Sequence, residues 1–260
     1  MIRAAISDLN IALRDSFLWG TLAWADIRMR YRRSLLGPLW MTITMGGMIF
    51  GMGPVYASIF RQRLTDFYPY LALGFIMWGF ISTVMNEACM TFISGETYIK
   101  QVPLALSHLA LRVVGRNLII LAHHALLIIP IYLLVGRPVD ETALLAVPGI
   151  FISAISALGV CYFLGALNAR FRDVQQIVLA VTQLVFFLTP ILWKPAQLVD
   201  SDALVKFNPF FYMIEVVRAP LLGEVPSLDT YIIAAGIATA SFGMGFLIFS
   251  RFRTRLAYWV

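Results

Sequence analysis

The sequence of 260 residues has few charged side chains: only 13% are Asp, Glu, Lys or Arg, whereas 60% are hydrophobic. A soluble domain usually carries about 25% charged residues, so this chain lacks the material for a water-facing surface of ordinary polarity. Its charges also gather in short stretches between long uncharged segments. Lipid is therefore expected to be the main solvent, and the predicted fold class is an all-α integral membrane protein.

The chain also lacks the motifs by which proteins bind nucleotides or metals. It has no G-x-x-x-x-G-K-[ST] loop and no Gly-Lys dipeptide, so no phosphate-cradling P-loop is encoded. No Cys/His group has zinc spacing, and no nucleophile with a plausible base is recognisable. Cys89 and Cys161 both fall in apolar segments and are expected to be packing residues. We therefore expect no catalytic residue, metal or cofactor in this chain.

Six segments have the length of about 20 mostly apolar residues that a membrane-spanning helix needs. Only the second contains an acidic residue, Glu87, near one end, and the first contains the single G-x-x-x-G, Gly47 to Gly51, which would let two helix backbones approach closely. No repeat or linker divides the chain, so residues 1–260 are expected to form one membrane domain. The predicted spans cover residues 37–60, 67–92, 117–136, 142–169, 174–193 and 230–250.

Lysine and arginine indicate the orientation. Six of the 20 precede the first span, five lie in the second and fourth loops and three in the C-terminal tail, which leaves six on the opposite side. Segments this short follow the positive-inside rule, so both termini are expected in the cytoplasm. The net charge of +6 is attributed to basic loops beside anionic lipid rather than to nucleic acid. The five loop residues are Lys100, Arg112, Arg116, Arg170 and Arg172.

Residues 15–33, before the first span, have a different pattern. Tryptophans and aliphatic residues mix there with a basic end, which suits an amphipathic helix lying in the membrane interface. An ordinary juxtamembrane anchor is the alternative.

The longest external connection, residues 194–229, contains an apolar stretch at 207–222 that two prolines interrupt. This stretch is too short to span a bilayer, and its prolines favour short re-entrant helices in the outer leaflet. Glu215 and Arg218 are spaced i,i+3 and could pair on one helical face. A surface lid without re-entry is the alternative.

Aromatic residues in the second and fifth spans suggest a path for sugar chains. Aromatic faces bind the apolar faces of sugar rings without requiring one hydroxyl pattern, so a polymer could slide along them. Lipid-facing belts and core packing are the alternative, which spacing alone does not separate. The side chains are Phe75, Trp78, Phe80, Phe186, Phe187 and Trp193.

Five short segments, taken in order and position, resemble the membrane subunit of ABC-2 type polysaccharide exporters, the family that moves O antigen and related polymers. The resemblance covers nearly the whole chain. The segments are RYRRSLLGPLW at 30–40, YIKQVPL at 98–104, RDVQQ at 172–176, TPILW at 189–193 and NPF at 208–210.

This resemblance implies a homodimer of six-span subunits that works with two copies of a separate nucleotide-binding ATPase, where ATP and Mg²⁺ are bound. The implied substrate is undecaprenyl-diphosphate-linked polysaccharide, with O antigen as the expected polymer, moved outward across the bacterial inner membrane. Capsule and teichoic acid exporters share this architecture, so the polymer stays open.

The resemblance also implies roles for three segments. Residues 24–33 would be a gate helix whose arginines face the lipid diphosphate. Residues 94–103 would form a coupling helix that docks into the ATPase, with a plain loop as the alternative, and residues 194–229 would close the empty channel externally. The residues concerned are Trp24, Arg28, Arg30, Arg32 and Arg33; Glu96, Tyr98, Ile99 and Lys100; and Asn208, Pro209, Glu215 and Arg218.

Two other functions are less consistent with the sequence. A stand-alone secondary transporter would need midplane ionisable residues, for which only His123, His124 and Glu87 are candidates, and hydrogen bonding between helices explains the histidines better. A membrane enzyme acting on a lipid-linked sugar would need paired carboxylates, and the close pair Asp200 and Asp202 is better explained by a solvated loop.

Overall fold

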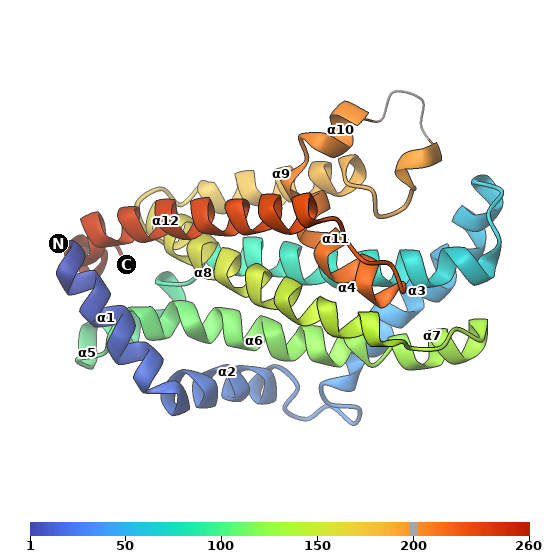
Figure 1. Cartoon of the computed structure of the whole chain (residues 1–260). Helices are drawn as coiled ribbons and strands as arrows, with labels where there is room; N and C mark the ends of the chain where they lie inside the picture. Colours follow the sequence, from blue (N-terminus) through green and yellow to red (C-terminus); the bar gives the residue numbers. More distant parts are fainter. Residues whose placement is uncertain (198–201) are drawn as a thin grey trace.

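A computed structural model describes residues 1–197 and 202–260, and these form helices joined by turns, without a β-strand among them. This confirms the all-α prediction. The long helices lie side by side along one elongated bundle (Figure 1). Both chain termini lie at the same end of the bundle, together with the short helix α5 (Glu96–Gln101); we call this the terminal end.

Four helical segments are long and apolar enough to cross a membrane, and they support an integral membrane protein. The most enclosed is α4, since 83% of its most apolar segment is buried. The six-span count stays a prediction for two helices, because neither α3 (Leu39–Ile59) nor α9 (Val174–Leu188, 15 residues) is among the four. The four segments are Leu64–Cys89 (α4), Ser107–Val135 (α6, Ser107–Ala125, and α7, Ile128–Val135), Glu141–Arg170 (η2, Glu141–Leu145, and α8, Ala146–Arg170) and Leu228–Trp259 (α12).

Proline explains where two helices stop. Thr189 precedes Pro190 and is extended, with ψ of 136°, so α9 ends five residues before the predicted end of the fifth span. Pro130 lies in α7, and its ring would clash with the carbonyl group of residue 126, where the break between α6 and α7 occurs.

The third span begins earlier than predicted. Helix α6 starts at Ser107 rather than near residue 117, so Arg112 and Arg116 lie inside a helix and not in a loop. Their charges do not interrupt the helix because carboxylates of neighbouring helices pair with them. The C-terminal helix α12 likewise continues nine residues beyond the predicted end of the sixth span.

Two helices, α1 (Ile2–Arg14) and α2 (Ser16–Arg30), precede α3. Asp15 caps α2 by accepting a hydrogen bond from the Leu18 N–H at 3.3 Å. The apolar residues of α2 are spread around the helix, with Phe17 and Met29 exposed, whereas α1 has one apolar face. The structure therefore differs from the predicted amphipathic helix over residues 15–33: the amphipathic pattern belongs to α1.

Helices α8 and α12 pack with their backbones in contact. A Cβ atom at Gly245 would lie 2.0 Å from the carbonyl oxygen of Gly159, so both positions need glycine. At the end opposite the termini lie η3 (Pro195–Gln197), α10 (Asp202–Lys206) and α11 (Pro209–Leu221). Residues 198–201, and with them Asp200, lie outside the described part of the chain.

Candidate functional site

A cleft of about 720 Å³ lies between α3, α4 and α9. Its wall carries aromatic rings from α4 and α9, and the rings contact one another: the centroids of Phe75 and Phe186 are 5.8 Å apart and those of Trp78 and Phe186 are 5.7 Å apart. Three amide side chains also line the cleft, and no charged residue is among its lining residues. The amides belong to Asn86, Gln176 and Gln183. Flat apolar faces beside neutral hydrogen-bonding groups can bind sugar rings without gripping a charge.

The cleft brings together four of the six aromatic residues predicted for a sugar path, namely Phe75, Trp78, Phe186 and Phe187, whereas Phe80 does not line the cleft. Phe187 is 61% exposed and Trp78 only 8% exposed. Trp193 lies outside it: its indole N–H donates to the backbone oxygen of Phe187 at 3.2 Å, and its own backbone oxygen accepts from the Tyr70 hydroxyl. Trp193 therefore fixes the end of α9.

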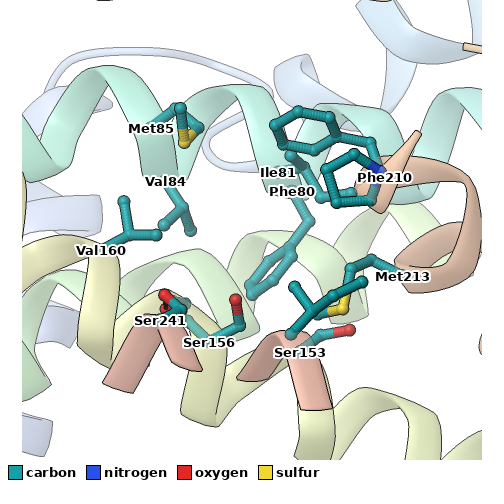
Figure 2. Close-up of a pocket in the computed structure, with 13 residues that line it drawn as sticks. Phe80, Ile81, Val84, Met85, Ser153, Ser156, Val160, Phe210, Met213 and Ser241 are labelled. Carbon is teal, nitrogen blue, oxygen red and sulfur yellow. Dashed lines mark hydrogen bonds between the residues drawn. The ribbon is translucent and has the colours of Figure 1, made fainter. Parts of the chain in front are cut away.

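A second cavity, of about 250 Å³, lies between α4, α8, α11 and α12 (Figure 2). Its lining is apolar except for three serines, and two of these hydroxyl groups already donate to backbone oxygens: Ser153 to Gly149 at 2.9 Å and Ser241 to Ser156 at 3.1 Å. The edge contact between Trp78 and Phe210, at 5.9 Å, links its wall to that of the cleft. The amides of the cleft make it the better candidate for carbohydrate.

Toward the terminal end, three helices meet in a group of ion pairs that we call the Glu87 cluster. It consists of Asp26 and Arg30 of α2, Glu87 of α4, and Arg112 and Arg116 of α6. Both arginines of α6 bind Asp26, with Arg112 Nε 2.8 Å from Asp26 Oδ2, and Arg116 Nη2 also donates to Glu87 at 2.7 Å. Arg30 Nη2 completes the cluster at 3.0 Å from Glu87 Oε1.

Burial makes the pairing in this cluster necessary. The side chain of Asp26 is 9% exposed and those of Arg112 and Arg116 are each 14% exposed, and a charge this buried is costly unless it is paired. Burial raises the pKa of Asp26, but the hydrogen bonds and positive charges of Arg112 and Arg116 outweigh it, so the pKa lies below its ordinary value. Counted by formal charge, three arginines against two carboxylates leave the cluster with one positive charge in excess.

The predicted gate arginines are not equivalent. Arg30 joins the cluster, whereas Arg28, Arg32 and Arg33 are exposed and form no ion pair with other described residues. Helix α2 ends at Arg30, so Arg32 and Arg33 lie in the following turn, and Arg33 has a positive φ of 74°. Trp24 lies on an exposed part of α2.

Sequence reasoning missed Asp26, Arg112 and Arg116 as site residues. The available signal was the i,i+4 spacing of Arg112 and Arg116, which places both on one face of a helix. Because the predicted third span began near residue 117, both arginines fell in a loop, where i,i+4 spacing does not place two side chains on one face.

The predicted coupling segment is helical: η1 (Ile93–Gly95) leads into α5. Glu96 and Lys100 form an i,i+4 ion pair of 2.6 Å on its exposed side, and Lys100 lowers the pKa of Glu96. Tyr98 connects α5 to the Glu87 cluster because the guanidinium of Arg112 lies 5.8 Å from the centre of its ring. Ile99 is half-buried and packs against the core.

The start of α6, which follows α5, is held by Asp8 of α1. Its buried carboxylate accepts hydrogen bonds from the N–H groups of Leu106 and Ser107, at 3.1 and 2.8 Å, and pairs with Arg253 of α12 at 2.7 Å. A carboxylate at a helix N-terminus satisfies N–H groups that lack an intrahelical partner.

The four residues predicted for the external side lie together at the other end of the bundle. Arg218 is 1% exposed and pairs with Glu215 at 2.6 Å, which confirms the pairing predicted from their spacing. Arg218 also donates to the Pro190 backbone oxygen at 2.6 Å. Asn208 donates to Thr189 Oγ1 at 3.0 Å and caps α11, whose first residue is Pro209.

Comparison with known proteins agrees with this architecture. Residues 18–222 match the family model described as ABC-2 type transporter. The chain is 25% identical over 209 residues to the O-antigen export system permease protein RfbA of Myxococcus xanthus, covering 76% of this chain and 78% of that protein. A protein of the same name from Klebsiella pneumoniae is 27% identical over 199 residues, covering 73% and 74%. Since the family model covers most of the sequence, the chain belongs to the ABC-2 type transporter family.

Proposed function

We propose that this chain is the membrane subunit of an ATP-driven exporter that moves lipid-linked polysaccharide outward across the bacterial inner membrane. The observation that carries the proposal is the uncharged cleft, in which aromatic rings of α4 and α9 lie beside three amides. The relatives named as O-antigen export permeases support a polysaccharide, and O antigen on undecaprenyl diphosphate is the polymer that we expect. A capsule or teichoic acid polymer on the same carrier is the second candidate.

A second copy of the chain would close the cleft into a channel. The cleft is only partly enclosed, and α3 and α9, which border it, expose apolar side chains such as Ile43 and Leu184. In α3, a Cβ atom at Gly47 or Gly51 would meet nothing within 4 Å, so the G-x-x-x-G motif is not used within the subunit and is free to contact a partner helix. The proposed assembly is therefore a homodimer with six spans per subunit and all termini in the cytoplasm.

ATP and Mg²⁺ would be bound by two copies of a separate ATPase that dock on α5. The charged pair Glu96 and Lys100 offers an exposed contact, and Ile99 connects the helix to the core. Movement of α5 would reach α6 through Tyr98 and Arg112. The exposed arginines near the end of α2, Arg28, Arg32 and Arg33, would hold the lipid diphosphate by charge-assisted hydrogen bonds.

The secondary transporter is less well supported. Glu87, the acidic candidate for a proton relay, is already paired with Arg30 and Arg116, and His123 Nδ1 lies 2.8 Å from the backbone oxygen of Ile119 in its own helix.

Co-purification tests the proposed function. The tagged chain, extracted in mild detergent, should bring down a P-loop ATPase in equal amount, and Lys100→Glu should release that ATPase. Arg63→Glu, an exposed charge at the opposite end of the bundle, is the matched control and should keep the ATPase bound. A chain that purifies alone and transports in liposomes without ATP would contradict the proposal.

A further inference from the structure

The carboxylate of Glu87 lies in a set of donors that suits a phosphate group. Its Oε1 accepts from Arg30 Nη2 at 3.0 Å. Its Oε2 accepts from Arg116 Nη2 at 2.7 Å, from Arg116 Nε at 3.1 Å and from Asn117 Nδ2 at 2.7 Å. Two guanidinium groups and an amide, drawn from two helices, are the donors that proteins use for oxyanions, and here the chain's own carboxylate occupies them.

The two sides of the cluster differ in access. On the inner side, Asp26 is bound by both arginines of α6 and is nearly buried. On the outer side, Arg30 is 48% exposed and Glu87 is 17% exposed. The five charged groups sum to one positive charge, so the outer side attracts a further anion while the inner pairs keep Arg112 and Arg116 in place.

The end of α2 has the freedom that an exchange of partners needs. Arg30 is the last residue of the helix, and among the described residues its side chain is bonded to another helix through Glu87, at 3.0 Å. The following segment has positive φ at Arg33 and Gly37, and a Cβ atom at Gly37 would meet nothing within 4 Å. Arg30 can therefore change partners without disturbing the packing of α2 against α6.

We propose that Glu87 is a resident counter-anion that a phosphate group of the transported lipid displaces from Arg30. The identity of the ligand rests on the proposed function, whereas the exchange rests on the cluster itself. In the empty protein Glu87 ties the end of α2 to α4. When a phosphate binds, Arg30 turns to it, Glu87 stays with Arg116 and Asn117, and the tie between α2 and α4 opens. A continuous chain of contacts leads from this point to α5, through Arg116, Asp26, Arg112 and Tyr98. Binding of the lipid phosphate would therefore change the position of α5, where the ATPase is proposed to dock.

Two neutralising variants test the exchange because they break the same ion pair with opposite consequences. Glu87→Gln removes the competing anion and leaves Arg30 available, so the purified chain in lipid nanodiscs should bind farnesyl diphosphate about fivefold more tightly. Arg30→Gln removes the cation and should weaken binding by about the same factor. Arg63→Gln, at the opposite end, is the control for net charge and should leave affinity unchanged.

A purely structural ion pair predicts a different result, since both variants would then lose affinity or stability together. Weaker binding of farnesyl diphosphate by both variants, or unchanged binding by both, would overturn the exchange. If Glu87→Gln proves unstable in thermal unfolding, Glu87→Asp is the second variant. It retains the negative charge and should bind farnesyl diphosphate with normal affinity. Inorganic pyrophosphate as a second probe separates the sources: opposite shifts with pyrophosphate alone identify a free anion as the ligand and overturn the lipid assignment. Opposite shifts with the lipid, in a chain that exports no polysaccharide, would support the exchange while contradicting the proposed function.

Discussion

The two ends of the bundle both contain buried arginines, but they hold them in different ways. At the terminal end, Arg112 and Arg116 bind carboxylates of other helices, and each carboxylate is shared between two arginines. At the opposite end, Arg218 binds Glu215 of its own helix and a backbone oxygen, and it lies 4.1 Å from the centre of the Tyr70 ring.

This difference separates a fixed contact from an adjustable one. A backbone oxygen and a ring in a buried helix cannot be exchanged without moving the backbone, so the region around Arg218 should act as a rigid closure. Carboxylates shared by several guanidiniums can lose one partner and keep another, so the Glu87 cluster can rearrange at low cost. The opposite end is expected to stay closed while the terminal end responds to ligands.

The largest effect is expected at Arg218. Arg218→Met should destabilise the protein by about 3 to 4 kcal/mol, because the partly buried Glu215 and the backbone oxygen of Pro190 both lose the Arg218 guanidinium. Thermal unfolding in detergent would measure this. Tyr70→Phe is the matched control: it removes the hydroxyl bonds to the backbone oxygens of Pro190 and Trp193 but keeps the ring, and should cost about 1 to 2 kcal/mol. Equal effects would mean that the charge of Arg218 adds nothing to the closure.

Asp26→Asn should have the next largest effect, about 2 to 3 kcal/mol, because Arg112 loses its carboxylate while Arg116 keeps Glu87. The loss should loosen α2 from α6, so limited proteolysis should cut the segment at residues 31–37 more rapidly. Unchanged proteolysis with reduced stability would show that the inner pairs hold the bundle but not α2.

Asp8→Asn should cost about 1 to 2 kcal/mol, since the start of α6 keeps one amide acceptor while the pair with Arg253 is lost. Arg253→Gln keeps the bonds from Leu106 and Ser107 but leaves the fully buried Asp8 carboxylate without a cation, so it should cost at least as much as Asp8→Asn. Chemical unfolding of the two variants would rank them, and a clearly smaller cost for Arg253→Gln would show that the helix cap, not the ion pair, carries the contribution of Asp8.

Phe187→Ala should change stability least, by less than about 0.5 kcal/mol, because the ring is 61% exposed. It should nevertheless reduce polymer export, since the ring lines the cleft. Phe151→Ala removes a ring of similar exposure, 67%, from α8 and should leave export unchanged. Surface immunoblotting of the polymer in cells would compare the two.

The sequence predicted those parts of the molecule that depend on local pattern. Long apolar segments identified the helices, and aromatic residues in the second and fifth spans, such as Phe75 and Phe187, came together in one cleft. The pairing of Glu215 with Arg218 followed from their spacing within one helix.

The Glu87 cluster could not be predicted in the same way. Its pairs join residues that are 29 to 90 positions apart, and only the packing of three helices brings them together. In the sequence, Arg112 and Arg116 are two charges that predict the boundary of a span. In the structure, carboxylates of neighbouring helices pair with them, so α6 continues past both residues. The amphipathic pattern of α1 is local and can be read from the sequence, whereas the packing of Trp19 of α2 beside Gly115 of α6 joins residues far apart in the chain.

The most direct test of the central claim, that the cleft carries the polymer, is to narrow the cleft and measure polymer at the cell surface. Ala180 is exposed and lines the cleft, whereas Ala240 is exposed on α12 and lines neither cavity. Ala180→Trp should abolish surface polymer while the subunit still accumulates and binds its ATPase, and Ala240→Trp should export normally. Equal export by the two variants would contradict the account.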